Sequence, residues 1–289
     1  MLDLSYLPPA AVAGLLGVLG LLVGSFLNVV IHRLPKMMEQ EWAQDCRELL
    51  GQEAVDTAPY TLWAPRSACP HCGHQIRWYE NIPVVSYLAL RGRCSGCKAP
   101  ISARYPVIEA VTALLFAWCG HQFGATWAAL AWCAFSALLV SMTCIDWDTQ
   151  LLPDDLTYSL LWLGLLGSVV GWTGVPVAMA VLGALAGYLS LWTVTQAFKL
   201  LTGKIGMGNG DFKLFAALGA WFGWQALVPI ILLSCVVGIV VGVALKAMRK
   251  SGQGDPIPFG PFLSGAGFLA MFLGGPALLQ GMGHLVLGA

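Results

Sequence analysis

The stretch "GMGNGDFKLF" (206–215) places a charged carboxylate, Asp211, between three spaced glycines and a strongly apolar run. Burying an ionisable group at the start of such a run is costly, so its presence calls for a structural or chemical reason. In the whole chain 57% of residues are hydrophobic and 10% are charged, and the mean hydropathy is +0.73. These values predict an integral membrane protein, with Asp211 at the mouth of a membrane span.

The apolar residues are distributed over eight candidate spans. Crossing a hydrocarbon core takes about 20 apolar residues per helix, and these segments are rich in the Gly and Ala that let membrane helices pack closely. The expected fold class is therefore an all-α polytopic membrane protein. The expected spans are 10–31, 106–121, 126–145, 156–172, 175–198, 212–223, 225–245 and 259–286.

The basic residues predict the orientation of these spans. All 15 Lys and Arg residues fall in three segments, 33–104, 199–213 and 246–250. With eight spans the three segments share one side, which the positive-inside rule identifies as the cytoplasm, so both termini are expected to face outward. This partition requires a turn around 219–224, although a re-entrant segment of similar length is an alternative for the sixth span.

Residues 32–105 form the one large insertion between expected spans. It contains "CPHC" (69–72) and "CSGC" (94–97), and two such motifs can present four thiolates at the Zn–S distance of about 2.3 Å. On the cytoplasmic side these thiols stay reduced and available to metal. Four thiolates leave no open position for water, so a structural zinc ion is expected. Its predicted ligands are Cys69, Cys72, Cys94 and Cys97.

A second acidic cluster, "CIDWDTQLLPDDLTY" (144–158), lies between the third and fourth spans. Asp146 and Asp148 are two residues apart, which places them on nearly opposite faces of a helix, so only one can face the bundle. Asp146 is closer to the apolar run and is the candidate, with a solvated helix-end carboxylate as the alternative. Pro153 interrupts the helix, and one of the two aspartates after it is expected to cap the next helix.

Asp146 and Asp211 are expected at the same membrane face, each between a cytoplasmic loop and a span. The glycines at 206, 208 and 210 permit unusual backbone conformations and the close approach of another chain, such as a substrate. Two neighbouring carboxylates share one proton, so one activates water while the other donates a hydrogen bond to a scissile carbonyl. No G-x-S-x-G or H-E-x-x-H motif occurs in the chain.

Several stretches together carry a resemblance to a known family. They are "GSFLNVVIHRLP" (24–35), "CPHC", "CSGC", "ARYPVIEAVTALLF" (103–116), "IDWDTQLLPDDLT" (145–157), "GMGNGDFKL" (206–214) and "PFGPFL" (258–263). With these motifs the chain resembles the type 4 prepilin peptidases, which are bifunctional leader peptidase/N-methyltransferases of bacterial type IV pilus and type II secretion systems. They belong to the GxGD class of intramembrane aspartyl proteases.

The resemblance implies that Asp146 and Asp211 are the catalytic pair, at the cytoplasmic face of the bacterial inner membrane. The implied substrates are prepilins and pseudopilins, cut after a glycine that ends a short basic leader. Membrane lipid is the other expected partner, and nucleic acid is not expected. Between 36 and 58 six acidic residues outnumber two basic ones, which suits a basic leader but suits a solvated helix equally well.

N-methylation is expected from the resemblance alone. The resemblance implies S-adenosylmethionine as the methyl donor and connects Gly92, in "LRGRC" (90–94), with methyl transfer. No Rossmann-type G-x-G-x-x-G unit follows a strand in the insertion. The physical alternative for Gly92 is a turn glycine that sets up the Cys94 motif.

The expected organisation has three parts: a first transmembrane helix (1–31), a cytoplasmic zinc-binding insertion (32–105) and an aspartyl peptidase membrane domain (106–289). Both termini are expected in the periplasm. Two other functions remain open. A leader peptidase without methylation would not need the cysteine insertion, and a membrane transporter would show internal repeats with breaks near the bilayer centre.

Overall fold

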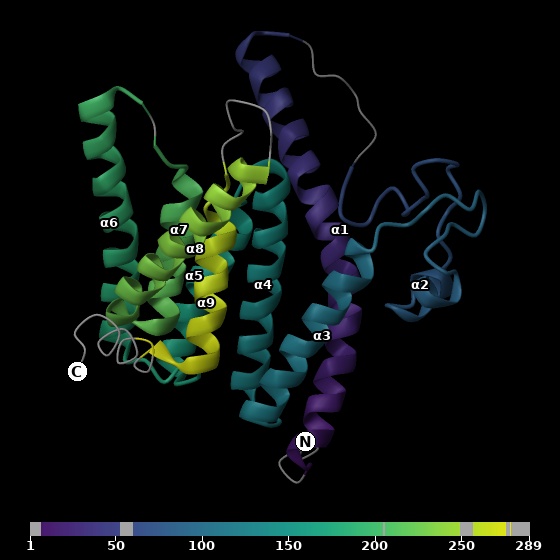
Figure 1. The fold of residues 1–289 in the computed structure, drawn as a ribbon, viewed down its shortest axis with the longest axis horizontal. Helices are drawn as coiled ribbons and strands as arrows, with labels where there is room; N and C mark the ends of the chain where they lie inside the picture. The colour runs from purple at the N-terminus through teal and green to yellow at the C-terminus, as the bar shows by residue number, and fades with distance from the viewer. Residues whose placement is uncertain (1–6, 53–59, 205, 249–256, 276–277, 279–289) are drawn as a thin grey trace. The chain divides into compact units, whose positions relative to one another are not determined.

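The computed structural model describes residues 7–52, 60–204, 206–248, 257–275 and 278. Within these ranges the chain is helical and has no strand, with isolated β-bridges only in the cysteine insertion (Figure 1). The helices are α1 (Pro9–Leu49), α2 (Val85–Ala89), α3 (Arg104–Phe123), α4 (Trp127–Thr149), α5 (Asp154–Val170), α6 (Val177–Thr202), α7 (Asn209–Phe222), α8 (Leu227–Met248) and α9 (Gly260–Leu273), with 3-10 helices η2 (Trp78–Asn81) and η3 (Trp224–Ala226). The expected all-α fold class is confirmed.

Each expected span overlaps one of these helices, although α1 is longer than the span 10–31 and α9 ends at Leu273, inside the span 259–286, where Gly274 has a φ of 82°. In the described ranges four helices are long and apolar enough to cross a membrane: α1, α4, α6 and the helix that contains α8. The helix α7 has 14 residues and is about 21 Å long, which is less than the ~30 Å of a hydrocarbon core. Part of the span 259–286 and both termini lie outside the described residues. The count of eight crossings and the orientation therefore stay predictions.

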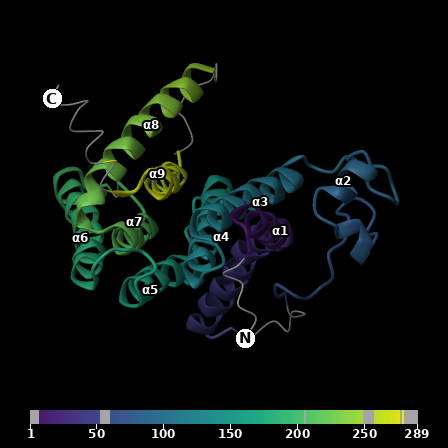
Figure 2. The same cartoon turned by 90° about the horizontal axis from the view of Figure 1, so that it is seen from below.

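The chain forms two compact units, Met1–Ser141 and Met142–Ala289. In the first unit α1 and α3 lie side by side (Figure 2) and run in opposite directions, since Gly20 meets Ala113 and Gly24 meets Glu109. A Cβ at Gly20 would lie 2.7 Å from the Ala113 Cα, and one at Gly24 would lie 2.7 Å from the Glu109 Cα. These glycines permit the close approach of backbones that replaces hydrophobic collapse in membrane helix pairs.

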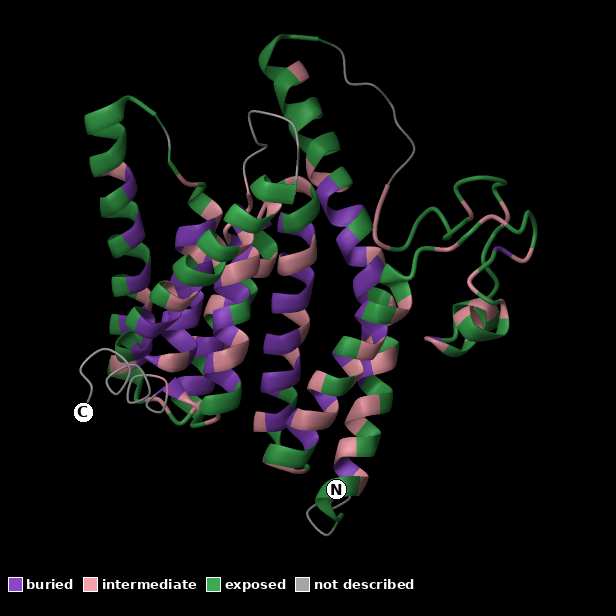
Figure 3. Cartoon of the chain, viewed as in Figure 1, coloured by how far each residue is buried: buried purple, intermediate pink, exposed green. Residues whose placement is uncertain are grey.

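The helix α1 extends well beyond the expected end of the first span at residue 31. Residues 36–49 are rich in Glu, Gln and Met, which are good helix formers, and Pro35 lies inside the helix without ending it. This extension is largely exposed (Figure 3). The insertion therefore begins as a solvent-exposed continuation of the first helix rather than as a loop.

The core of the second unit is α7, which lies among α5, α6 and α9. Almost every residue from Asp211 to Trp221 is buried, and much of the region around this helix is purple in Figure 3. The Trp221 indole donates a hydrogen bond to the Leu160 carbonyl of α5 at 2.9 Å. A helix enclosed in this way fixes the position of the aspartate in its first turn.

The predicted turn between the sixth and seventh spans is confirmed. The helix α7 ends at Phe222, and Gly223 adopts a positive φ of 78° before η3 begins. Just before this turn Gly219 packs directly on Gly183 of α6, where neither residue has room for a Cβ. The break therefore follows from glycine at both a turn and a close helix crossing.

Candidate active site and metal centre

The two candidate aspartates are buried in the second unit. Asp146 lies near the C-terminal end of α4 and is 5% exposed, and Asp211 lies in the first turn of α7 and is 8% exposed. Asp148 is exposed. The prediction that only one member of the 146/148 pair faces the interior is confirmed, while the catalytic roles themselves stay a prediction.

The two carboxylates are close enough to interact electrostatically. Each also accepts a backbone N–H from a glycine: Asp211 from Gly208, and Asp146 from Gly260. One oxygen of each, Asp146 Oδ2 and Asp211 Oδ1, is buried without a hydrogen-bond partner among the described residues. Since buried polar atoms in native proteins are nearly always paired, these two oxygens indicate a place for a proton, a water molecule or a substrate group.

The glycines before Asp211 act differently from the sequence prediction. Gly208 has φ −74°, and neither Gly206 nor Gly210 is among the described residues with positive φ, so the prediction of unusual backbone conformations is wrong. Close approach is what they permit. A Cβ at Gly210 would lie 2.6 Å from the Cβ of Leu152, which belongs to the segment between α4 and α5. The loop is therefore packed against this chain's own acidic segment.

The aspartates after Pro153 do not cap α5, so that prediction is also wrong. Pro153 itself precedes the first helical residue, and Asp154 is already in the first turn, where its side chain is past the capping position. Asp154 instead binds Lys213, whose Nζ lies 2.5 and 2.7 Å from the two carboxylate oxygens. This ion pair joins the start of α5 to α7 at a position two residues after Asp211.

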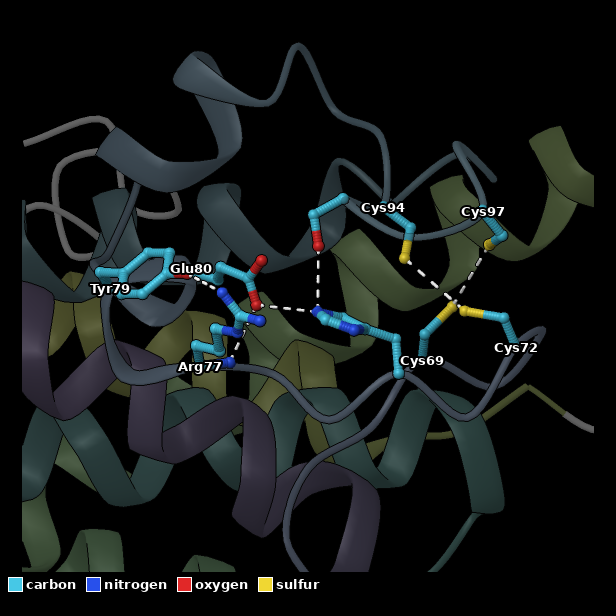
Figure 4. A network of polar contacts seen from close by, with 9 residues as sticks. Cys69, Cys72, Arg77, Tyr79, Glu80, Cys94 and Cys97 are labelled. Atoms are coloured by element: carbon cyan, nitrogen blue, oxygen red, sulfur yellow. Dashed lines mark hydrogen bonds and ion pairs between the residues drawn. The ribbon is translucent and has the colours of Figure 1, made fainter.

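The four predicted zinc ligands converge in the first unit, and their sulfur atoms point toward one another (Figure 4). All four sulfur atoms lie within 4.8 Å of one another, and the distances Cys69–Cys97 and Cys72–Cys94 are both 3.9 Å. Four sulfurs placed about 2.3 Å from a central zinc in a tetrahedron are separated by about 3.8 Å. The cluster therefore fits a tetrahedral ion of this size.

The backbone of each cysteine turn favours the thiolate form that binds metals. The N–H groups of His71 and Cys72 donate toward the Cys69 sulfur and lower the pKa of that thiol to about 7. Backbone N–H groups of the second turn lower the pKa of Cys94 in the same way. At Cys72 the His74 N–H also lowers the pKa, but bonds among the thiols outweigh it and raise the value to about 11. Four neighbouring thiols thus need a cation to ionise together.

A network of hydrogen bonds connects the two cysteine turns, and the sequence pattern did not predict it. His74 Nε2 lies 3.1 Å from Glu80 Oε2 and 3.0 Å from Ser95 Oγ. The Arg77 backbone N–H donates to Glu80 at 2.9 Å and is the main cause that lowers the pKa of Glu80 to about 2 (Figure 4). Because the serine and the acid meet the same imidazole nitrogen, this is no nucleophilic triad. The network links the first turn, η2 and the second turn.

Two buried charged residues attach the insertion to the helices of the first unit. Arg33 of α1 donates to the carbonyls of Thr61 and Pro65 at 2.8 and 2.6 Å. Glu109 of α3 accepts the Val84 N–H at 2.7 Å. Buried charges are costly unless they are hydrogen-bonded, so both residues define fixed points of the insertion. A charge at position 109, inside an expected span, is the sequence signal that identifies this role.

Gly92 lies in a turn with φ 66°, so its interpretation as a turn glycine is confirmed. Its N–H donates to the Tyr87 carbonyl at 2.9 Å, and its carbonyl accepts the Ile101 N–H at 2.7 Å. A Cβ at Gly92 would lie 2.9 Å from the Tyr87 hydroxyl oxygen. The turn and the contact with Tyr87 account for a glycine at this position, and a role of Gly92 in methyl transfer stays a prediction.

Comparison with known families follows the same division of the chain. Residues 18–123 match the Bacterial Peptidase A24 N-terminal domain, which includes the cysteine insertion. Residues 133–243 match the Type IV leader peptidase family, which includes Asp146 and Asp211. The two candidate sites therefore lie in two separately matched regions.

Similar proteins cover nearly the whole chain. A "Prepilin leader peptidase/N-methyltransferase" of Aeromonas hydrophila is 52% identical over 276 residues, or 95% of each chain. A protein of the same name from Pseudomonas aeruginosa is 55% identical over 257 residues, covering 89% of this chain and 88% of the relative. A third, from Burkholderia pseudomallei, is 49% identical over 265 residues, covering 91% of this chain and 85% of the relative. No solved structure matches.

Proposed function

Because the chain belongs to the type IV leader peptidase family, we propose that it is a bifunctional prepilin peptidase and N-methyltransferase. It cleaves the short basic leader of prepilins and pseudopilins with Asp146 and Asp211, and then methylates the new N-terminal amine. The observation that carries the peptidase proposal is the pair of buried, interacting carboxylates from α4 and α7, each with one oxygen unpartnered in the described structure.

The chemistry of cleavage follows from this pair. With one proton shared between the two carboxyl groups, the ionised one takes a proton from water while the protonated one donates to the carbonyl oxygen of the scissile peptide bond. Water adds to the carbonyl carbon, the C–N bond then breaks, and the leaving nitrogen takes up a proton to become a free amine. Burial of both carboxylates strengthens these electrostatic interactions by excluding bulk water.

Methylation must follow cleavage, because its acceptor amine exists only after the leader has been removed. S-adenosylmethionine, when bound, supplies an electrophilic methyl group on sulfur. The names of the relatives support this activity, and the space beside Gly92 is taken by the Tyr87 side chain. The proposed role of Gly92 is therefore to shape the turn between Tyr87 and Cys94 rather than to bind the methyl donor.

The cysteine cluster is proposed to hold one structural zinc ion. Cys69, Cys72, Cys94 and Cys97 supply the four thiolates, which satisfy a tetrahedral shell without leaving a position for water. The zinc then acts on the shape of the insertion and takes no part in peptide hydrolysis. The insertion is proposed to face the cytoplasm in the inner membrane, with both termini in the periplasm, and the three-part organisation 1–31, 32–105 and 106–289 stays part of this proposal.

The test uses the purified full-length protein, a prepilin-like peptide with its leader and S-adenosylmethionine labelled on the methyl group. We expect the leader to be released and the label to appear on the new N-terminus. Cleavage without label, also when a leaderless peptide is supplied, would support a peptidase that lacks methylation. If well-folded protein does not release the leader, the peptidase proposal is contradicted, and the alternative of a membrane transporter is favoured.

A further inference from the structure

The segment "PFGPFL" (258–263) begins α9 next to one of the two candidate aspartates. Gly260 is the first residue of α9 and is buried, with Pro261 following it at a position where proline suits a helix start. Its backbone N–H donates to the carboxylate of Asp146. A residue that is distant in sequence thus lies directly against the carboxylate of Asp146.

The contact depends on the absence of a side chain. A Cβ at Gly260 would lie 2.5 Å from Asp146 Oδ2 and 3.2 Å from its Cγ, and real Cβ atoms essentially never approach another atom within 3.0 Å. The next neighbour, Leu152 Cδ1, would be 3.3 Å away. Oδ2 is also the Asp146 oxygen that has no partner among the described residues. The space that a methyl group would take is therefore beside the oxygen of Asp146 that has no partner among the described residues.

Asp211 shows the contrasting arrangement. It also accepts a glycine N–H, but the donor is Gly208, three residues earlier in the same segment. A Cβ at Gly208 would lie 3.9 Å from Asp211 Oδ2, which is an ordinary contact distance. Local backbone geometry holds Asp211 and tolerates a small side chain, whereas Asp146 depends on close packing against α9.

We propose that Gly260 is a positioning residue for peptide cleavage, which fixes the Asp146 carboxylate through its N–H and its missing side chain. This rests on the proposal that Asp146 is catalytic. The carboxylate is the end of a short side chain with two rotatable bonds, so an added methyl group turns it aside more easily than it moves either helix. The substitution is thus expected to disturb the chemistry much more than the fold.

The experiment compares Gly260→Ala with Gly265→Ala on the same helix, where a Cβ would meet nothing within 4 Å. Misplacing a reacting group by about 1 Å can lower a rate about 100-fold. We expect Gly260→Ala to lower kcat for leader cleavage by about that factor, with KM within about threefold of the wild-type value. Gly265→Ala should cleave as the wild type does, and Gly260→Ala should still methylate a leaderless peptide.

Stability measurements supply the second readout. If Gly260→Ala lowers the unfolding temperature, the double variant Asp146→Ala/Gly260→Ala should recover it, because the contacted carboxylate is gone. A loss that persists in the double variant would contradict the proposal. So would wild-type cleavage by Gly260→Ala while Asp146→Asn is inactive. If Asp146→Asn itself cleaves normally, the assignment of the catalytic pair fails, and the role of Gly260 fails with it.

Discussion

The cysteine insertion gathers its four sulfur atoms with turns and hydrogen bonds, while the aspartate pair is placed by packed helices. Between residues 66 and 102 only Pro83 and Cys94 are buried. Around Asp211, by contrast, nearly the whole of α7 is buried. A region with so little core depends on a bound ion for its shape, whereas the aspartates sit in a scaffold that stays folded when one polar atom is changed.

The difference also separates the two regions by the kind of substitution that they tolerate. A change from aspartate to asparagine removes a titratable group and keeps the volume, so the helices around it have no reason to rearrange. Loss of one thiolate from the insertion removes part of the binding free energy that folds it. Substitutions of the aspartates should therefore lower activity much more than stability, whereas substitutions of the cysteines should lower stability more.

The largest expected effect is on cleavage. Asp146→Asn and Asp211→Asn should each lower the cleavage rate by about 10²–10⁴-fold or more, since each removes a proton-transfer group, while membrane insertion and the unfolding temperature stay close to wild type. Asp148→Asn is the matched control because Asp148 is exposed, and it should be mild. Normal processing by either of the first two variants would contradict the aspartyl mechanism. If Asp148→Asn is inactive and Asp146→Asn is active, then Asp148 and not Asp146 is the partner of Asp211.

The next effect concerns metal. Protein prepared without chelator should contain one zinc per chain by metal analysis, and Cys94→Ser should lose most of it and become sensitive to proteolysis within 66–105. The exposed thiol of Cys46 lies outside the cluster, so Cys46→Ser should keep both zinc and protease resistance. A full zinc complement in Cys94→Ser, or none in the wild type, would rule out this ligand set.

A smaller and more selective effect is expected at Gly92. Gly92→Ala places a Cβ near the Tyr87 hydroxyl and strains a residue with φ 66°, so it should lower methyl transfer several-fold more than leader cleavage. Gly73→Ala separates strain from collision, because Gly73 has φ 70° and a Cβ there meets nothing within 4 Å. Both activities are scored on one sample. Equal loss of both in Gly92→Ala would mean that the insertion also shapes the peptidase.

The smallest effect is expected from the ion pair beside Asp211. Lys213→Met removes the bond to Asp154, and partly exposed pairs contribute only about 0–1 kcal/mol to stability. We expect a few-fold decrease in kcat and an unfolding temperature within a few degrees of wild type. Lys199→Met, on the exposed end of α6, should leave both unchanged. A loss as large as that of Asp211→Asn would give Lys213 a part in catalysis rather than in packing.

The sequence is sufficient for those features that local patterns encode. Apolar segments locate the helices, and the paired C-x-x-C spacing identifies four sulfur atoms that do converge. The two-residue spacing of Asp146 and Asp148 separates a buried from an exposed carboxylate because helical periodicity alone decides it.

Contacts between distant residues account for what the sequence does not reveal. Asp154 and Lys213 are 59 residues apart. Nothing in the sequence around either residue predicts that Asp154 forms an ion pair with Lys213 instead of capping a helix. Gly260 and Asp146 are also far apart in sequence. The sequence "FGP" predicts a helix start, but it does not predict which residue that start will contact. The sequence pattern also led to a wrong prediction of unusual backbone conformations for the glycines before Asp211. A glycine can be required either for a positive φ or for close packing, and the sequence alone does not distinguish the two.

Methylation by a cleavage-dead enzyme tests most directly whether the two activities are separable. Asp211→Asn is given labelled S-adenosylmethionine with either a full prepilin-like peptide or the same peptide supplied without its leader, and cleavage and label are measured separately. We expect no cleavage and no label on the full peptide, but label on the leaderless peptide at a rate close to wild type. The opposite result is a variant that is folded and holds its zinc but does not methylate the leaderless peptide. That result would contradict the proposal that cleavage and methylation are separable activities of two regions of one chain.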